Sequence, residues 1–304
     1  MLMDRLESMA AFVAVVEQGG FTPASRLLGM PVATLSRKVS ELEAHLRVRL
    51  LTRGSRLTVP TEAGQRFFAT AQRLLEEVAE AERSISGAMP APRGELVVSA
   101  PPSLGRIHIA PLVAEFLRAF PDVSVRLMMT ERLVNLAEEQ VDIALRIGQT
   151  AESGQVALPL GAIRRLTCAS PAYLAVRGEP ADPAALAGHD GVTLANQPPS
   201  GAWEYRGQRV AVRGRLAVSD GAAAVEAAAC GAGITRALCF EVAQAVAAGR
   251  LLVLLRGFEP PPMPIYLVHP GGRRVPLRRS AFIDFIRTRL PPRLAFAESG
   301  ARSG

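Results

Sequence analysis

The first ninety residues carry apolar side chains at helical spacing in separate runs. The first run has apolar residues at intervals of three and four: Leu6, Met9, Phe12, Val13 and Val16. Two glycines end it, and Thr22-Pro23 predicts a capped short helix over residues 23–28. A third helix is predicted over residues 32–46, with Leu35, Val39 and Leu42 on its buried face. Two helices therefore meet across a short turn.

A hairpin and a long helix are predicted next. Residues 48–59 alternate apolar side chains with arginines around Gly54-Ser55, which is typical of a hairpin with arginine at its tip. From Thr61 a helix is expected, with an apolar stripe at Phe67, Phe68, Ala71, Leu74, Leu75, Val78, Ala81 and Ile85. A single helix cannot bury this stripe, so we expect a homodimer held by Phe67, Ala71, Leu74, Leu75 and Val78.

Gly and Pro over residues 87–94 predict a domain boundary, after which strands alternate with helices. This pattern is typical of an α/β domain with a largely parallel sheet. The first stretch has expected strands at 95–100, 123–130 and 141–147 and helices at 109–120 and 133–139. The second has strands at 191–194, 210–218, 234–235 and 251–255, and helices at 222–230 and 240–248. A strand at 265–269, a helix at 277–290 and a polar tail at 295–304 complete it. The expected domains are 1–60, 61–93 and 94–304.

Composition narrows the class of protein. The chain has 304 residues, 49% hydrophobic and 21% charged, which excludes wholesale disorder and an integral membrane protein. The first residues do not read as a secretory signal, so we expect a cytoplasmic protein without a membrane partner. Three cysteines, Cys168, Cys230 and Cys239, are too few and too far apart for a disulfide framework or a paired zinc site, and no metal or cofactor is expected.

Positive charge is concentrated near the predicted turn. The net charge is +7, and Lys38 is the only lysine. Residues 32–60 hold six basic side chains (Arg37, Lys38, Arg47, Arg49, Arg53 and Arg56) against two acidic ones (Glu41 and Glu43). A helix, turn, helix and wing with this excess of positive charge is typical of proteins that bind a DNA duplex. A basic helical hairpin alone is as often a solvated surface.

Catalytic chemistry has little support, and we expect no enzyme. The four histidines include no pair at metal-ligand spacing, and no serine lies in a Gly-x-Ser-x-Gly elbow. Gly231-Ala232-Gly233 lacks the third glycine of a dinucleotide fingerprint and is better interpreted as a tight turn.

Several motifs resemble one family along residues 4–290. The DNA-binding half has GFTPASRLLGM from Gly20, TLSRKVSELE from Thr34 and LTVPTEAG from Leu57. The remainder has APPSLGR from Ala100, FLRAFPDV from Phe116, VDIALRIG from Val141, ASPAYL from Ala169, GAGI from Gly231 and AAGRL from Ala247. Together they resemble the LysR-type transcriptional regulators.

The resemblance implies an α+β multidomain fold. It has a winged helix-turn-helix, a dimerising linker helix and a two-lobed α/β effector domain resembling type II periplasmic binding proteins. Lobe I would span about 94–166 and 266–304, and lobe II about 167–265, with crossings near Thr167 and Ile265. The implied partners are DNA with two-fold symmetric half-sites, a small-molecule effector such as an organic or aromatic acid, RNA polymerase during activation, and further copies in a homodimer or homotetramer.

The expected DNA-facing residues are Val32, Thr34, Ser36, Arg37 and Lys38 in the recognition helix, with Arg53 and Arg56 of the wing on the DNA backbone. The family usually has Ser-Gln-Pro where this chain has Pro31-Val32-Ala33. Valine cannot make the bidentate contact to adenine that glutamine makes, although it can touch a thymine methyl.

The expected effector site lies at strand ends. Pro102 and Ser103 stand where a strand gives way to a helix, so free N–H groups and a hydroxyl would favour an anion. The other expected residues are Thr130, Arg146 and Ile147 in the first lobe and Asn196, Thr235 and Arg236 in the second. The alternative for Arg146 is an internal ion pair with Asp142 or Glu131. Cys230 and Cys239 flank the Gly231 turn, where inert cysteine is favoured over a redox pair.

Two classes of function remain open. One is an effector-gated, DNA-binding regulator, and the other is a solute-binding or catalytic α/β protein with an accessory helical domain. The lack of a recognisable signal and of a catalytic constellation favours the regulator.

Overall fold

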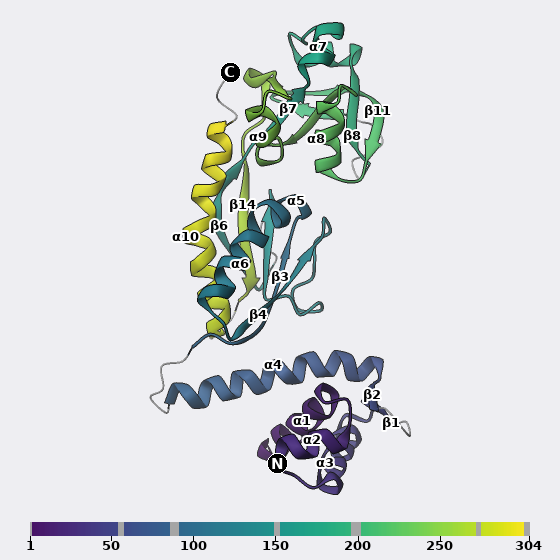
Figure 1. Ribbon diagram of the computed structural model, residues 1–304, viewed down its shortest axis with the longest axis vertical. Coiled ribbons are helices and arrows are strands. Elements are labelled where there is room, and N and C mark those ends of the chain that lie inside the picture. The colour runs from purple at the N-terminus through teal and green to yellow at the C-terminus, as the bar shows by residue number, and fades with distance from the viewer. Residues whose placement is uncertain are drawn as a thin grey trace. The chain divides into compact units, whose positions relative to one another are not determined.

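The computed structural model describes residues 2–53, 58–85, 91–148, 153–195, 202–271 and 275–300. They form two compact units, Met1–Ala91 and Pro92–Gly304 (Figure 1). No helix in the described part of the chain is long and apolar enough to cross a membrane.

The first unit is a small helical domain with a wing. Its elements are α1 (Leu2–Glu17), α2 (Phe21–Leu28), α3 (Val32–Leu46), β1 (Leu51–Arg53), β2 (Thr58–Pro60) and α4 (Glu62–Ile85). Phe12, Leu35 and Val39 are fully buried in its core, as the helical spacing predicted. β1 and β2 pair antiparallel, which confirms the predicted hairpin. α2 begins two residues before the predicted start, because Gly20 occupies the cap position and no side chain caps the helix, so the predicted Thr22 cap is wrong.

The long helix α4 is partly buried within its own unit. Phe67 and Phe68 pack against Phe12, one tilted and one edge-on, with ring centroids 5.7 and 6.4 Å from that of Phe12. Ala71 is fully buried in the same core, and Leu75 packs against it. The predicted stripe therefore has a partner in its own chain along much of its length, and Leu74 remains 41% exposed.

The second unit contains two five-stranded sheets. The first has the strand order β4-β3-β5-β14-β6, in which β3 pairs parallel with β4 and β5 while β14 runs antiparallel between β5 and β6. The strands are β3 (Gly94–Ala100), β4 (Val123–Met129), β5 (Ile143–Ile147), β6 (Gln155–Ile163) and β14 (Met263–Pro270). A continuous helical run follows β3: α5 (Pro102–Leu104), η1 (Gly105–Ile109) and α6 (Ala110–Ala119). Its middle turn, η1, is a π-helix.

The second sheet has the order β11-β8-β12-β7-β13. Its strands are β7 (Arg165–Ala169), β8 (Asp190–Leu194), β11 (Arg213–Val218), β12 (Ile234–Leu238) and β13 (Leu252–Leu254). Around it lie α7 (Pro171–Arg177), η2 (Pro183–Gly188), α8 (Gly221–Ala229), α9 (Cys239–Ala247), η3 (Arg256–Phe258) and a hairpin of β9 (Ala202–Tyr205) and β10 (Gln208–Ala211). β8 is parallel to β11 and β12, so the carboxyl ends of these strands meet at one edge.

The chain crosses between the sheets at Arg164 and again between Phe258 and Met263, a few residues before the expected positions. α10 (Leu277–Gly300) then packs beside β6 and contacts α6 and α9 (Figure 1). Its helix extends to Gly300, so the predicted polar tail over residues 295–300 is wrong, and the last four residues lie outside the described part.

Two predicted elements differ from the structure. Residues 133–139 form turns instead of a helix, because side chains bond the backbone of this segment. The predicted strand 210–218 is two strands that separate at Val212, since β10 pairs antiparallel with β9 and β11 pairs parallel with β8. The strands β6, β7 and β9 and the helices α7, η2 and η3 were not predicted.

Candidate functional site

The outer face of α3 is the candidate nucleic-acid interface. Val32 is 42% exposed and Arg37 is exposed, with a 2.7 Å ion pair to Glu41 one turn later. Thr34 and Ser36 are half-buried beside them. α3 therefore presents a short apolar, hydroxyl and guanidinium surface at its N-terminal half, the part that reaches base edges in helix-turn-helix proteins.

Lys38 does not belong to that surface. Its side chain is buried, and Nζ donates to Oε2 of Glu7 at 2.6 Å and lies 3.7 Å from Oδ1 of Asp4. The hydrogen bond to Glu7 raises the pKa of Lys38 above its usual value. The prediction that Lys38 faces DNA is wrong, because its ammonium is engaged with α1.

A buried carboxylate fixes the wing to α3. Oε1 of Glu43 accepts hydrogen bonds from the backbone N–H groups of Leu50 and Leu51, at 2.7 and 3.0 Å. Gly64 of α4 lies against the backbone of Leu50, directly before β1, and a Cβ there would lie 2.0 Å from the Leu50 carbonyl oxygen. Of the predicted wing arginines, Arg56 lies outside the described residues, and only the backbone of Arg53, at the end of β1, is described.

The second unit has a cavity of about 410 Å³ between its two lobes. Five of the predicted effector residues line it: Ser103, Thr130, Arg146, Ile147 and Arg236. It opens at the carboxyl ends of β3, β4, β5, β8 and β12, where open α/β sheets bind ligands. Pro102 and Thr235 are not among its lining residues, and the hydroxyl of Thr235 donates to the Val192 carbonyl at 3.2 Å. Asn196 lies outside the described residues.

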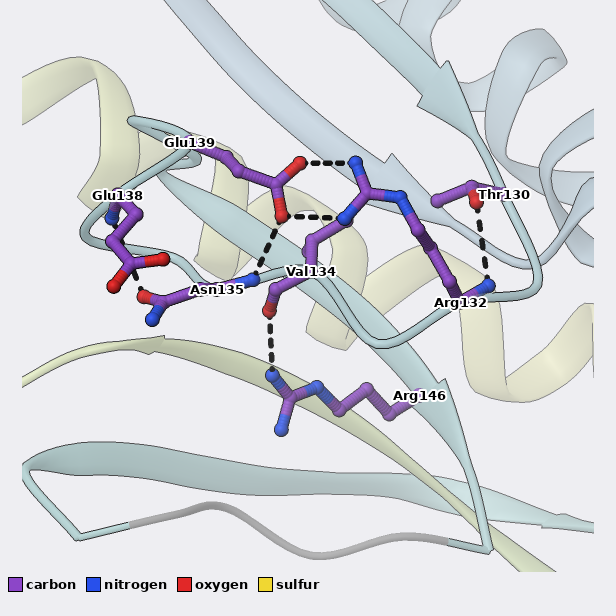
Figure 2. A network of polar contacts seen from close by, with 7 residues as sticks. All are labelled: Thr130, Arg132, Val134, Asn135, Glu138, Glu139 and Arg146. Atoms are coloured by element: carbon purple, nitrogen blue, oxygen red, sulfur yellow. Dashed lines mark hydrogen bonds and ion pairs between the residues drawn. The ribbon is translucent and has the colours of Figure 1, made fainter.

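Arg146 is buried at the floor of this cavity, with 5% of its surface exposed. Its Nη2 donates to the Val134 carbonyl at 3.3 Å (Figure 2). Asp142, one of the suggested ion-pair partners, instead pairs with Arg279 of α10 at 2.9 Å and accepts from the Val97 N–H at 3.0 Å. The Arg146 guanidinium is therefore oriented by a neutral carbonyl.

The loop that carries Val134 is closed by its own side chains (Figure 2). Arg132 forms a two-point ion pair with Glu139, whose Oε1 also accepts from the Asn135 N–H at 3.0 Å. The Asn135 amide oxygen accepts from the N–H groups of Ala137 and Glu138 at 3.1 and 3.3 Å. These bonds fix the carbonyl that positions Arg146.

Arg236 reaches the cavity from the opposite lobe. It is 9% exposed, its guanidinium lies 4.5 Å from the centroid of the Tyr205 ring, and the Tyr205 hydroxyl lies 2.7 Å from that of Thr167. Burial lowers the pKa of Arg236 and raises that of Tyr205. Within the described residues, Nε of Arg236 has no hydrogen-bond partner.

The lining also contains two carboxylates, Glu131 and Glu241; the sequence suggested Glu131 only as an ion-pair partner of Arg146 and did not single out Glu241. Glu131 follows Thr130 directly at a strand end, so the rule that selected Thr130 applies to it equally. Glu241 accepts from the Leu238 N–H at 2.7 Å at the start of α9, and no sequence signal placed it at the cavity.

The described residues contain no disulfide and no cluster of side chains suited to a metal ion. Cys168 and Cys239 are buried and Cys230 is exposed. Burial raises the pKa of Cys168 to about 12, which keeps it a thiol. No group of three or more His, Cys, Asp or Glu suited to a metal ion occurs in this part of the chain.

Comparisons with known proteins agree with this arrangement. Residues 6–65 match the bacterial regulatory helix-turn-helix protein, lysR family, and residues 90–291 match the LysR substrate binding domain. The regulator PtxR of Pseudomonas aeruginosa is 34% identical over 96% of both chains, and the activator AaeR of Escherichia coli K12 is 30% identical over 93% of both. The structure of CrgA from Neisseria meningitidis, a LysR-type transcriptional regulator, aligns over 93% of this chain and 98% of that one, with 33% identity and a TM-score of 0.61.

The winged helix-turn-helix and the two-lobed domain define a DNA-binding transcriptional regulator, not an enzyme. The chain belongs to the LysR family of these regulators.

Proposed function

We propose that a small organic acid, with an aromatic acid as one candidate, binds the cavity between the lobes and modulates DNA binding. The observation that carries this proposal is the pair of buried guanidinium groups, Arg146 and Arg236, which face one cavity from opposite lobes. Buried cations are normally paired with an anion, and an arginine fork suits a carboxylate. The Ser103 side chain beside them supplies a hydroxyl, and Leu133, Leu194 and Met263 supply apolar wall.

A ligand held by both lobes would act on their relative position. A carboxylate bound between Arg146 and Arg236 stabilises only the arrangement in which both reach it, and a ligand shifts an equilibrium by its differential affinity for the two states. The effector would in this way select one arrangement of the lobes.

For DNA, we propose that Val32, Thr34, Ser36 and Arg37 face the major groove and that Arg53 and Arg56 contact the backbone. A homodimer or homotetramer, joined in part through Leu74 and Val78, would place two such helices on two-fold symmetric half-sites. The protein would act in the cytoplasm and would contact RNA polymerase when it activates transcription.

Calorimetry with a panel of small organic acids tests the effector site. We expect a panel member to bind the wild type and to lose affinity with Ser103→Ala and with Arg146→Ala. Arg118→Ala is the matched control, because Arg118 is exposed on α6 and does not line the cavity. Equal affinity in all four proteins would show that the acid does not bind at this site.

A further inference from the structure

The cavity carries carboxylates from both lobes as well as guanidinium groups. Glu131 belongs to the first lobe and Glu241 to the second, and both line the same space as Arg146 and Arg236. Loss of hydration raises the pKa of Glu131, and the charges of Glu241 and Asp220 raise it further, whereas Arg165 lowers it. The negative charge of Glu241 therefore acts on Glu131 across the cleft.

Glu241 is fixed in place by backbone groups. Its Oε2 accepts from the Leu238 N–H at 2.7 Å, and its Oε1 lies where a Cβ on Gly221 would come within 2.5 Å. Gly221 begins α8, so this carboxylate is held between the starts of two helices, where the helix dipoles favour negative charge. These contacts hold the Glu241 carboxylate at the cavity wall.

Arg236 brings a largely buried guanidinium to the cavity, independently of the carboxylates. Nine-tenths of its surface is buried, its Nε has no hydrogen-bond partner in the part of the chain that the structure describes, and the Tyr205 ring fixes it at the cavity wall. Arg146 is more deeply buried, and its Nη2 donates to the neutral carbonyl of Val134. A plain acid would satisfy these guanidinium groups but would place no positive charge between Glu131 and Glu241, whose like charges repel.

We propose that the effector is a zwitterion of the amino-acid class. Its carboxylate binds Arg146 and Arg236, its ammonium binds between Glu131 and Glu241, and its side chain packs on Leu133, Leu194 and Leu238. A cavity of about 410 Å³ has room for such a molecule. This proposal rests on the function proposed above and narrows its ligand.

The test is calorimetry of the full-length protein with the twenty common amino acids. Each binder is compared with its des-amino acid, in which hydrogen replaces the amino group, and with its amide, which lacks the carboxylate. We expect the amino acid to bind at least about tenfold more tightly than either analogue, because each analogue loses one charge-assisted contact.

Variants test whether Glu131 contacts the ammonium group of the ligand. Glu131→Gln should weaken the amino acid about tenfold and leave the des-amino acid unchanged or tighter. Glu138→Gln is the control, because Glu138 lies on the same loop but does not line the cavity.

Two results would overturn the proposal that the effector is a zwitterion. One is a des-amino acid that binds as tightly as its amino acid, and the other is equal weakening of both by Glu131→Gln. Either leaves the acid-binding function standing if Arg146→Ala still weakens both ligands. Failure of every amino acid and every des-amino acid to bind would overturn both proposals.

Discussion

Nζ of Lys38 lies 2.6 Å from Oε2 of Glu7 and joins the recognition helix α3 to α1 within the DNA-binding unit. Arg37, the adjacent residue in sequence, is exposed, and it pairs with Glu41, one turn along its own helix. Two neighbouring basic residues therefore have different roles: one stabilises the domain and the other is available to DNA.

The salt dependence of DNA binding distinguishes the roles of Arg37 and Lys38. Arg37→Ala should abolish specific binding, because an exposed guanidinium on the recognition surface is lost. Lys38→Met should leave the slope of log affinity against log salt unchanged and lower the free energy of unfolding by about 1 kcal/mol. Fluorescence anisotropy and urea unfolding measure these quantities. A slope reduced by about one unit in Lys38→Met would show that the lysine does reach a phosphate.

Glu43 should control the wing. Glu43→Ala leaves the N–H groups of Leu50 and Leu51 without their acceptor, and each unsatisfied buried donor costs about 1–3 kcal/mol. We expect a fall of about 3 kcal/mol in the free energy of unfolding, measured in urea. Glu43→Gln keeps an acceptor oxygen and should recover much of the loss. A variant with alanine as stable as the wild type would show that the wing needs no such anchor.

The exposed part of α4 should hold the dimer. Leu74→Glu and Val78→Glu should dissociate it and abolish operator binding together, because a charge would be buried at the interface. Sedimentation velocity measures the assembly, and Gln65→Glu, an exposed change on the same helix, is the control. If the Leu74 and Val78 variants remain dimeric, other surfaces hold the assembly.

His108 should make stability depend on pH. Burial, together with the nearby charge of Arg293, lowers its pKa from 6.5 to about 4. Its ring packs edge-on against Phe240 with centroids 5.1 Å apart, and its Nε2 has no partner within the described residues. The folded protein thus keeps this histidine neutral over a range in which the unfolded chain binds a proton.

The contribution of neutral His108 to the free energy of unfolding is fully present above about pH 6.5 and is lost as the pH falls from there to about 4. Its size is about 3 kcal/mol, since each pKa unit corresponds to about 1.4 kcal/mol. Urea unfolding between pH 7 and pH 4 should show a smaller loss in His108→Gln than in wild type, with exposed His45→Gln as control. Identical pH profiles for His108→Gln and wild type would contradict this account.

Local patterns predicted the elements whose stability is local. Apolar periodicity located α1, α3 and the wing, because each buries one face against the next. The same spacing failed at residues 133–139, where the Arg132–Glu139 pair and the Asn135 side chain compete for the backbone. Lys38 was misplaced because its partner lies 31 residues away.

The cleft was predicted in part for a similar reason. Strand ends selected Thr130, Arg146 and Arg236, since parallel strands bring their carboxyl ends to one edge. Glu241 faces Glu131 only because two separate sheets are placed opposite each other, which no spacing within either one encodes. The interaction of Arg236 with Tyr205 likewise depends on the β9–β10 hairpin.

Footprinting of the DNA that flanks the coding region tests the central claim most directly. With full-length protein we expect protection of two half-sites related by a two-fold axis, and loss of that protection with Arg37→Ala but not with Lys38→Met at matched folded concentration. The extent or position of protection should change when a cavity ligand is added. Absence of protection at any flanking site would contradict a regulator that recognises DNA through α3.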